Sequence, residues 1–278
     1  MEETVMAITN FIPTVWSETL LSELNREYIG VKNCSREFEG DIKDKGSSVK
    51  IGNIGNISVF DYTKNSDMNA PETLSDSATT LEIDQAKAFN FQIDDIDRAQ
   101  AQPKLMKAAM KQAAAALADV ADKYVYSLWE QADYNKIITV DGLTADGVID
   151  MIVRARQALL AGGVNSNVET ALEVSPEVAA VILRSKILNS TENSDSFENG
   201  KLGKLIGFDI YVSPNIVNSD GRHKCLARTK RAVAFAEQLN EVEAYRPEMR
   251  FADAVKGLHL YGAKLVRPSE YLVLDVTV

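Results

Sequence analysis

The chain has 278 residues, of which 45% are hydrophobic and 25% are charged, a composition typical of one large or two small globular domains. Its formal net charge of −10 argues against electrostatic binding of nucleic acid, because phosphate contacts require clustered Lys and Arg. The acidic start is not a leader and no apolar run could span a bilayer, so we expect a soluble, intracellular protein with no membrane contact. Its two cysteines, Cys34 and Cys225, have no metal-ligand spacing and suit buried thiols in a reducing cytosol.

The first 35 residues predict an arm with a short amphipathic helix. Phe11 to Trp16 is a stiff apolar segment broken by Pro13, and Gly30 ends the pattern that follows. The apolar positions of the predicted helix are Trp16, Leu20, Leu21 and Leu24. A helix this short is marginal in water and has to dock on another surface. We expect an inter-subunit strap, with Phe11, Trp16 and Leu20 in the contact.

Residues 36–80 predict an extended β-hairpin loop. Gly52 and Gly55 lack the following Lys-Ser/Thr of a phosphate loop and do not open a helix, which argues against a nucleotide site. Residues 43–78 hold few large apolar side chains, so we expect them to add little to the subunit core and to lie on a neighbouring subunit. The assembly contacts expected in this loop are Lys45, Gly46, Gly55, Tyr62 and Lys64.

A long strand and a long helix form the centre of the chain. Apolar residues alternate from Leu81 to Ile93, interrupted on the apolar side only by Gln85 and Lys87, which predicts one strand over 79–93. A helix is predicted over about 98–131, rich in alanine and with Asp119 one turn before Lys123. Its predicted apolar stripe is Met106, Met110, Ala113, Leu117, Val120, Tyr124 and Leu128. Asp94, Asp95 and Asp97 precede this helix and are explained by capping, with a metal or acid–base site as the alternative.

Residues 135–240 predict an inserted α/β unit. Thr144 is expected to cap a helix that Gly162 and Gly163 end, and Ser175 to cap a second helix that opens with Pro176. The apolar face of the first helix is predicted to be Val148, Ile149, Ile152, Val153, Leu159 and Leu160. A strand is predicted over 206–212 and another around Cys225, after a turn at 218–221. The basic stretch 228–231 is interpreted as a solvated or interface patch.

Residues 241–278 predict strands that complete the unit around the long helix. Gly257 and Gly262 fall in a regular strand where bends or close packing are expected, and residues 271–276 form a final apolar strand. His223, expected in a turn, and His259, expected in a strand, have no Cys or carboxylate at metal-ligand spacing. Ser175 is not in a nucleophile elbow, so no catalytic residue, cofactor or metal ligand is predicted.

Several segments together resemble the major capsid proteins of tailed bacteriophages. They are Phe11-Ile-Pro-x-Val-Trp16, Leu81-x-Ile-Asp-Gln-Ala-Lys-x-Phe89, Asp94-Asp-Ile-Asp-Arg-Ala-Gln-Ala101, Gly207-Phe-Asp-Ile-Tyr-Val-Ser-Pro-Asn215, Ala234-Phe-Ala-Glu-Gln238, and the run from Val242 to His259. The resemblance covers essentially the whole chain, and the last segment is the most specific.

The resemblance implies an α+β protein of the Hong Kong phage-type capsid fold. Its parts would be an N-terminal arm (1–35), an extended loop (36–80), a peripheral domain with a long spine helix (81–134 and 241–278) and an inserted axial domain (135–240). Pentamers and hexamers would build an icosahedral shell around double-stranded DNA, in a virion made in the host bacterial cytoplasm. No cofactor is implied.

Two further expectations follow from the resemblance. Some relatives carry a long helical segment ahead of the position of residue 1, and its absence favours a separate scaffolding protein, alongside a portal. An encapsulin-like compartment, which shares the fold but holds protein cargo, is the alternative, and a metal-dependent enzyme using Asp94, Asp95 and Asp97 is a second.

Overall fold

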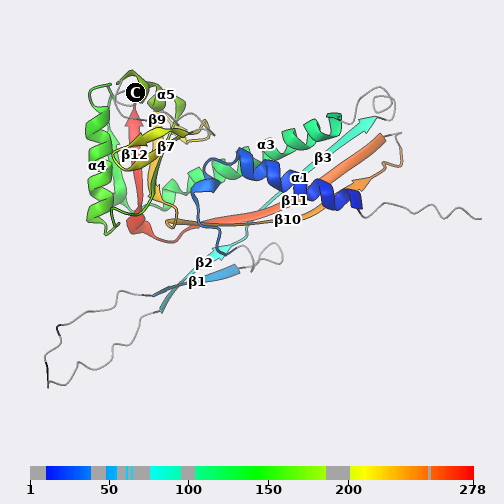
Figure 1. Ribbon diagram of the computed structural model, residues 1–278, viewed down its shortest axis with the longest axis horizontal. Coiled ribbons are helices and arrows are strands. Elements are labelled where there is room, and N and C mark those ends of the chain that lie inside the picture. The colour runs from blue at the N-terminus through cyan, green and yellow to red at the C-terminus, as the bar shows by residue number, and fades with distance from the viewer. Residues whose placement is uncertain are drawn as a thin grey trace, which may run out of the picture.

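The computed structural model describes residues 11–38, 48–54, 61, 64, 76–94, 104–185, 201–249 and 252–278. One long helix, α3 (Lys104–Ser127), runs along a three-stranded sheet, and a unit built on a seven-stranded sheet lies at one end of this body (Figure 1). A two-stranded ribbon leaves the body beneath the three-stranded sheet. The predicted α+β class is confirmed.

Helix α3 is buried along one side by small and apolar side chains. The buried side chains of α3 include Met110, Ala114, Leu117, Ala118, Ala121, Val125 and Tyr126, together with one carboxylate, Asp122. The predicted helix over 98–131 is therefore present as α3 and a 3-10 turn, η3 (Leu128–Gln131), while residues 98–103 lie outside the described part. The predicted stripe is wrong at Val120, which is 37% exposed. Tyr124 is half-buried, and its hydroxyl donates to the Asp84 carboxylate at 2.9 Å.

Helix α1 (Phe11–Glu27) packs on α3. Leu20 and Leu24 are fully buried in the cluster that lies between these helices and the three-stranded sheet. The prediction of a non-helical segment before Trp16 is wrong, since the helix begins at Phe11. Pro13 is tolerated because it stands in the first turn, where backbone N–H groups have no intrahelical acceptor.

Replacing Leu117 by Asp should destabilise the subunit by about 4 kcal/mol, because a charge would be buried without a partner. Lys111→Asp, at an exposed position about two turns earlier, should change stability by less than about 0.5 kcal/mol. Soluble yield and the urea midpoint measure both variants. Equal midpoints would show that the buried side of α3 is assigned wrongly.

The three-stranded sheet has the order β10–β11–β3 and is antiparallel throughout. Its strands are β3 (Gln85–Asp94), β10 (Val233–Tyr245) and β11 (Ala252–Leu265). A register shift between Leu239 and Glu241 interrupts the pairing of β10 with β11. Phe89, Phe235 and Tyr261 belong to the cluster shared with α1 and α3.

The predicted single strand over 79–93 is wrong, because it is two strands in two sheets. β2 (Asp76–Glu82) pairs with β1 (Ser48–Ile54), and after Ile83 and Asp84 the chain enters the three-stranded sheet as β3. The chain passes β11 at Gly262, where an added Cβ would lie 2.1 Å from the Glu82 carbonyl oxygen. A side chain at position 262 would therefore collide with the backbone at the break. The expectation of close packing at Gly257 and Gly262 is confirmed, since a Cβ at 257 would lie 2.4 Å from the Phe89 ring.

The base of the β1–β2 ribbon is part of the subunit core. Val49, Ile51, Leu81 and Ile83 are buried against Ala234, Ala236 and Leu260. The expectation that residues 43–78 add little to the core is therefore wrong for Val49 and Ile51. The alternating pattern of β1 buries one face of the strand and leaves Ser48, Lys50 and Gly52 exposed.

The seven-stranded sheet has the order β4–β12–β9–β5–β7–β6, with β8 paired to β9. Its strands are β4 (Ile137–Val140), β5 (Thr170–Val174), β6 (Lys201–Leu205), β7 (Phe208–Val212), β8 (Asn218–Ser219), β9 (Arg222–Thr229) and β12 (Tyr271–Thr277). Helices α4 (Val148–Ala161) and α5 (Pro176–Arg184) share one apolar cluster with side chains of this sheet. Besides η3, the short 3-10 turns are η1 (Val31–Asn33), η4 (Tyr134–Lys136) and η6 (Pro268–Glu270).

Two strands lie in sheets other than those predicted. The final strand β12 is predicted in the peripheral unit, but it pairs with β4 and β9 inside the seven-stranded sheet. The predicted boundary at residue 240 divides β10, but this strand belongs to the three-stranded sheet from Val233 onward. A strand with neighbours on both sides and both faces covered has a continuous apolar run, and β12 is buried from Tyr271 to Val276.

The helix caps and strand ends predicted in the seven-stranded unit are partly confirmed. The Ser175 hydroxyl accepts from Val178 N at 3.3 Å, so the predicted cap is confirmed, as is the end of α4 at Gly162. Thr144 is not the cap of α4, which Gly147 precedes. The predicted strand over 206–212 begins only at Phe208, because Ile206 and Gly207 form a turn.

Candidate functional site

The turn between α1 and the body is held by a buried carboxylate on the long helix. Asp122 of α3 accepts hydrogen bonds from Ile29 N and Val31 N, each at 2.9 Å. Gly30 permits this approach, because an added Cβ would lie 2.9 Å from Tyr126 Cζ. Burial raises the pKa of Asp122 to about 6, although the N–H groups of residues 29–31 favour the charged form.

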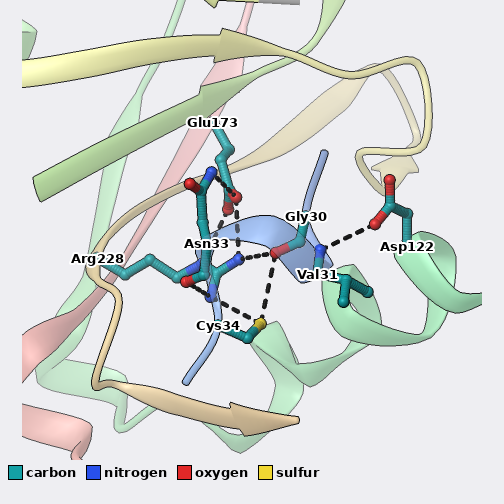
Figure 2. Close-up of polar contacts among 7 residues, drawn as sticks. All are labelled: Gly30, Val31, Asn33, Cys34, Asp122, Glu173 and Arg228. Atoms are coloured by element: carbon teal, nitrogen blue, oxygen red, sulfur yellow. Dashed lines mark hydrogen bonds and ion pairs between the residues drawn. The ribbon is translucent and has the colours of Figure 1, made fainter. Parts of the chain in front are cut away.

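A fully buried ion pair fastens the same turn to the seven-stranded sheet. Arg228 of β9 donates through Nε and Nη2 to the two carboxylate oxygens of Glu173 of β5, at 2.9 Å each, and both side chains are 0% exposed. The guanidinium also donates to the carbonyl oxygens of Gly30 and Asn33 at 2.8 Å. Figure 2 shows these groups converging on the turn, with Cys34 Sγ 3.2 Å from Arg228 Nη1.

Glu237 of β10 anchors the turn to the three-stranded sheet. Its carboxylate accepts from the Tyr28 hydroxyl and from Arg36, and lies 2.9 Å from His259 Nε2. Burial alone would raise the pKa of Glu237, but the hydrogen bond from His259 and the charge of Arg36 hold it below its ordinary value. Residues 28–36 are therefore bonded to α3 and to both sheets, and we call this region, with Asp122, Glu173, Arg228 and Glu237, the arm junction.

The arm junction is structural in its chemistry. Its carboxylates are each occupied by several donors within the protein, and burial raises the pKa of the Cys34 thiol, which makes it a poor nucleophile. Both cysteines are buried and unpaired, as predicted. In the ranges that the structure describes, no group of three His, Cys, Asp or Glu side chains could hold a metal ion. No helix in the same ranges is both long and apolar enough to cross a bilayer.

Of the three carboxylates in the alternative metal or acid–base site, the structure describes only Asp94. Asp94 ends β3 opposite Ala252, and Asp95 and Asp97 lie outside the described residues. The position of His223 was predicted wrongly, because it lies buried in strand β9 and not in a turn. His259 lies in a strand as expected, and its partner is the arm-junction carboxylate Glu237.

The predicted assembly residues are distributed unevenly over the described structure. Leu20 is fully buried against its own chain, so it has no surface to offer a neighbour in this conformation. Phe11 and Trp16 lie in α1, and Lys64 is exposed. Lys45, Gly46, Gly55 and Tyr62 fall outside the described residues, and their roles stay predictions.

Arg228 is the residue that sequence reasoning missed. The interpretation of the stretch 228–231 as solvated holds for Lys230, exposed, and for Arg231, whose side chain is 48% exposed. It is wrong for Arg228. A signal was present in the sequence, since Arg228 lies in a strand whose nearest members are apolar or short, where a charge needs a buried partner.

The raised pKa of Asp122 predicts that its contribution to the free energy of unfolding falls as the pH rises. Because its folded pKa of about 6 exceeds the ordinary value of 3.8, the contribution of this group to stability is present at low pH and is lost as pH rises through 6. Linkage limits the effect to about 3 kcal/mol. Asp122→Asn should therefore flatten the unfolding free energy between about pH 4 and 6, measured with urea, and leave its slope above pH 7 unchanged. Asp119→Asn, an exposed salt-bridge position on the same helix, is the control, and a slope unchanged by Asp122→Asn would contradict the assignment.

The sequence matches one protein family, and the fold is similar to those of several solved structures. The phage capsid protein family matches residues 77–273 of the chain. A structure from Mycobacterium phage Che8 is 28% identical with a TM-score of 0.66, covering 89% of this chain and 90% of that one. The capsid of Ralstonia phage GP4 is 12% identical with a TM-score of 0.68, covering 88% and 86%. The SrpI encapsulin complex from Synechococcus elongatus is 11% identical with a TM-score of 0.57, covering 84% and 83%. No curated protein matches the sequence.

Proposed function

The chain belongs to the phage capsid protein family and is a major capsid shell protein of a tailed phage, and from this premise we propose how its copies assemble and what they enclose. Pentamers and hexamers close an icosahedral shell around double-stranded DNA, with a separate scaffolding protein and a portal. The subunit is made in the cytoplasm of the bacterial host. It is a structural protein, and it has no catalytic activity and needs no cofactor.

The β1–β2 ribbon is the observation that carries this proposal. A two-stranded ribbon alone is marginally stable in water, and the contacts that the structure describes between this ribbon and its own subunit are at its base. It points away from the body (Figure 1). An element of this kind is supported once a second subunit lies beneath it, which is the situation in a closed shell.

The charge of the chain supports non-specific enclosure of DNA. A net charge of −10 repels phosphate, so the shell wall would hold packaged DNA without adhering to it. DNA is retained by closure of the shell and not by base or phosphate contacts of the subunit.

An encapsulin-like compartment is the second candidate. The structural likeness to the SrpI encapsulin favours it, but at 11% identity this likeness shows the fold alone. The contents of purified particles decide between the two. Packaged double-stranded DNA supports the phage shell, and a protein cargo without DNA supports the compartment.

The test is assembly with and without the proteins encoded beside this chain. We expect large closed particles in negative-stain microscopy and fast sedimentation when a scaffolding protein is co-expressed. A compact monomer under every condition, including co-expression of the scaffold, would contradict the proposal.

A further inference from the structure

Four cationic side chains gather where the chain passes between its two larger sheets, just before β12 (Figure 1). They are Lys136 of η4, Lys230 and Arg231 of the turn between β9 and β10, and Arg267 before η6. The turn and the crossing lie side by side, because the Ala232 carbonyl oxygen accepts from Val266 N at 2.9 Å and from Arg267 N at 3.1 Å. We call the four cationic residues the basic corner.

One buried carboxylate holds both arginines of the basic corner. Glu270 accepts from Arg231 Nε at 3.1 Å and Nη2 at 2.9 Å, and from Arg267 Nη1 at 3.2 Å. Burial alone would raise the pKa of Glu270, but hydrogen bonds from Thr229 and the two arginines hold it below its ordinary value. The carboxylate is therefore charged at neutral pH, and its single negative charge is shared between two positive ones.

The two lysines add positive charge that no carboxylate of the described residues neutralises by an ion pair. Lys136 Nζ donates to the Ser269 carbonyl oxygen at 3.4 Å, next to Glu270 in the chain, and Lys230 is exposed. The four cations and the Glu270 carboxylate together carry a charge of +3. Counting the exposed Asp133, which precedes Lys136 at the start of η4, leaves +2. On a chain of net charge −10, the basic corner is a local reversal of sign.

The basic corner is open to solvent and already ordered. The side chains of Arg231 and Arg267 are 48% and 42% exposed. A guanidinium group has five N–H donors, and Glu270 occupies two of those on Arg231 and one of those on Arg267. Because Glu270 fixes both side chains, they lose little further rotamer freedom when a second anion binds. The corner therefore has both the donors and the preorganisation of an anion-binding surface.

A short acidic peptide suits the basic corner better than a nucleic acid does. Duplex DNA is stiff and carries one negative charge per about 1.7 Å, so it would bring many phosphates against the acidic remainder of the chain. A flexible segment with a few Asp or Glu residues places its carboxylates on the corner alone. The planar guanidinium also binds a carboxylate through two parallel N–H groups, which is how Arg231 already binds Glu270.

We propose that the basic corner binds an acidic peptide segment of a partner protein. The carboxylates of the segment accept from the N–H groups of Arg231 and Arg267 that Glu270 leaves unoccupied, and from the ammonium groups of Lys136 and Lys230. The interaction is electrostatic and exposed, so it weakens as salt is added. It goes beyond the shell function and does not depend on it, because it concerns the surface of a single subunit.

Fluorescence anisotropy of the purified subunit with a labelled Glu-rich peptide tests the site. We expect salt-sensitive binding of this peptide and none of the analogue in which every Glu is Gln. Lys230→Glu should weaken binding at least five-fold, and its combination with Lys136→Glu at least ten-fold, while the melting temperature stays that of the wild type. The control is Lys111→Glu, the same charge change on α3, about 24 Å before the last residue of that helix. It should keep binding within two-fold.

Three results would overturn the proposal. Equal binding of the Glu and Gln peptides, or unchanged binding by the double variant, would show that the basic corner is not the site. Duplex DNA that binds as tightly as the Glu-rich peptide and competes with it would assign the corner to phosphate groups. Salt-sensitive self-association of the wild-type subunit that the double variant loses would assign it to a contact between copies. Each result leaves the shell function standing, because particle formation is measured separately.

Discussion

Replacing Arg228 by Met should lower the free energy of unfolding of the subunit by about 3–5 kcal/mol, because Glu173 would stay buried with its charge unpaired. The carbonyl oxygens of Gly30 and Asn33 would lose their donor at the same time. These carbonyls belong to the arm junction. We therefore expect Arg228→Met to increase amide hydrogen exchange, relative to the wild type, more in residues 28–36 than in the core of the seven-stranded sheet. Urea unfolding and amide exchange of the purified subunit measure the two effects.

The matched control is Arg231→Met, three residues further along the chain. Arg231 pairs with Glu270, but its side chain is 48% exposed, and Glu270 keeps hydrogen bonds from Thr229 and Arg267. Its loss should cost less than about 1 kcal/mol. The double variant Arg228→Met with Glu173→Leu should recover part of the loss by removing the unpaired charge, but not the part due to the carbonyls. Equal costs for Arg228→Met and Arg231→Met would show that the pair is not buried in solution.

Features set by neighbours in the sequence were predicted well. The Ser175 cap needs only the three residues that follow it, and the positive φ values at Asp220 and Gly221 fit the predicted turn over 218–221. The close approach at Gly262 was expected because glycine inside a regular strand marks a bend or a point where another backbone comes near. Long apolar periodicity likewise indicated the existence of α3, though not its ends.

Features set by distant partners were not predictable in the same way. The break at Ile83 and Asp84 has only a weak mark in the sequence. The polar residues Gln85 and Lys87 occupy the apolar positions just after it, but the alternation continues in phase while the strand changes sheets. Glu173 and Arg228 are 55 residues apart, and the sequence around each of them does not indicate that the other is its partner. The place of β12 between β4 and β9 depends on two pairings, one of them with a strand far earlier in the chain.

The α4 helix shows a different kind of error. The residues predicted to form one buried face divide into a buried set (Val148, Ile152 and Leu159) and an exposed set (Ile149, Val153 and Leu160). The sequence alone cannot separate the two sets, since six apolar positions cover more of the helix than the side that packs on its own sheet.

Replacing residues 55–75 by Asn-Gly should leave a folded subunit that closes no shells. Ile54 pairs with Asp76, so a two-residue type I′ turn joins β1 to β2 in register and keeps Val49, Ile51, Leu81 and Ile83 buried at the base. The subunit loses none of its described core, and its melting temperature should match that of the wild type. Any contact that residues 55–75 make with a neighbour disappears, and interfaces of ordinary size bury about 800 Å² per partner.

The larger replacement, of residues 43–78 by a Gly/Ser linker, provides the contrast. It removes β1, and the loss of buried Val49 and Ile51 should destabilise the subunit by about 3–6 kcal/mol in addition to abolishing assembly. A melting curve and negative-stain microscopy on the same preparations distinguish the two variants. Normal particles from the Asn-Gly variant would show that residues 55–75 are dispensable decoration. A molten Asn-Gly variant would show that these residues belong to the core of their own subunit, because the ribbon base is intact in it and the neighbour is absent.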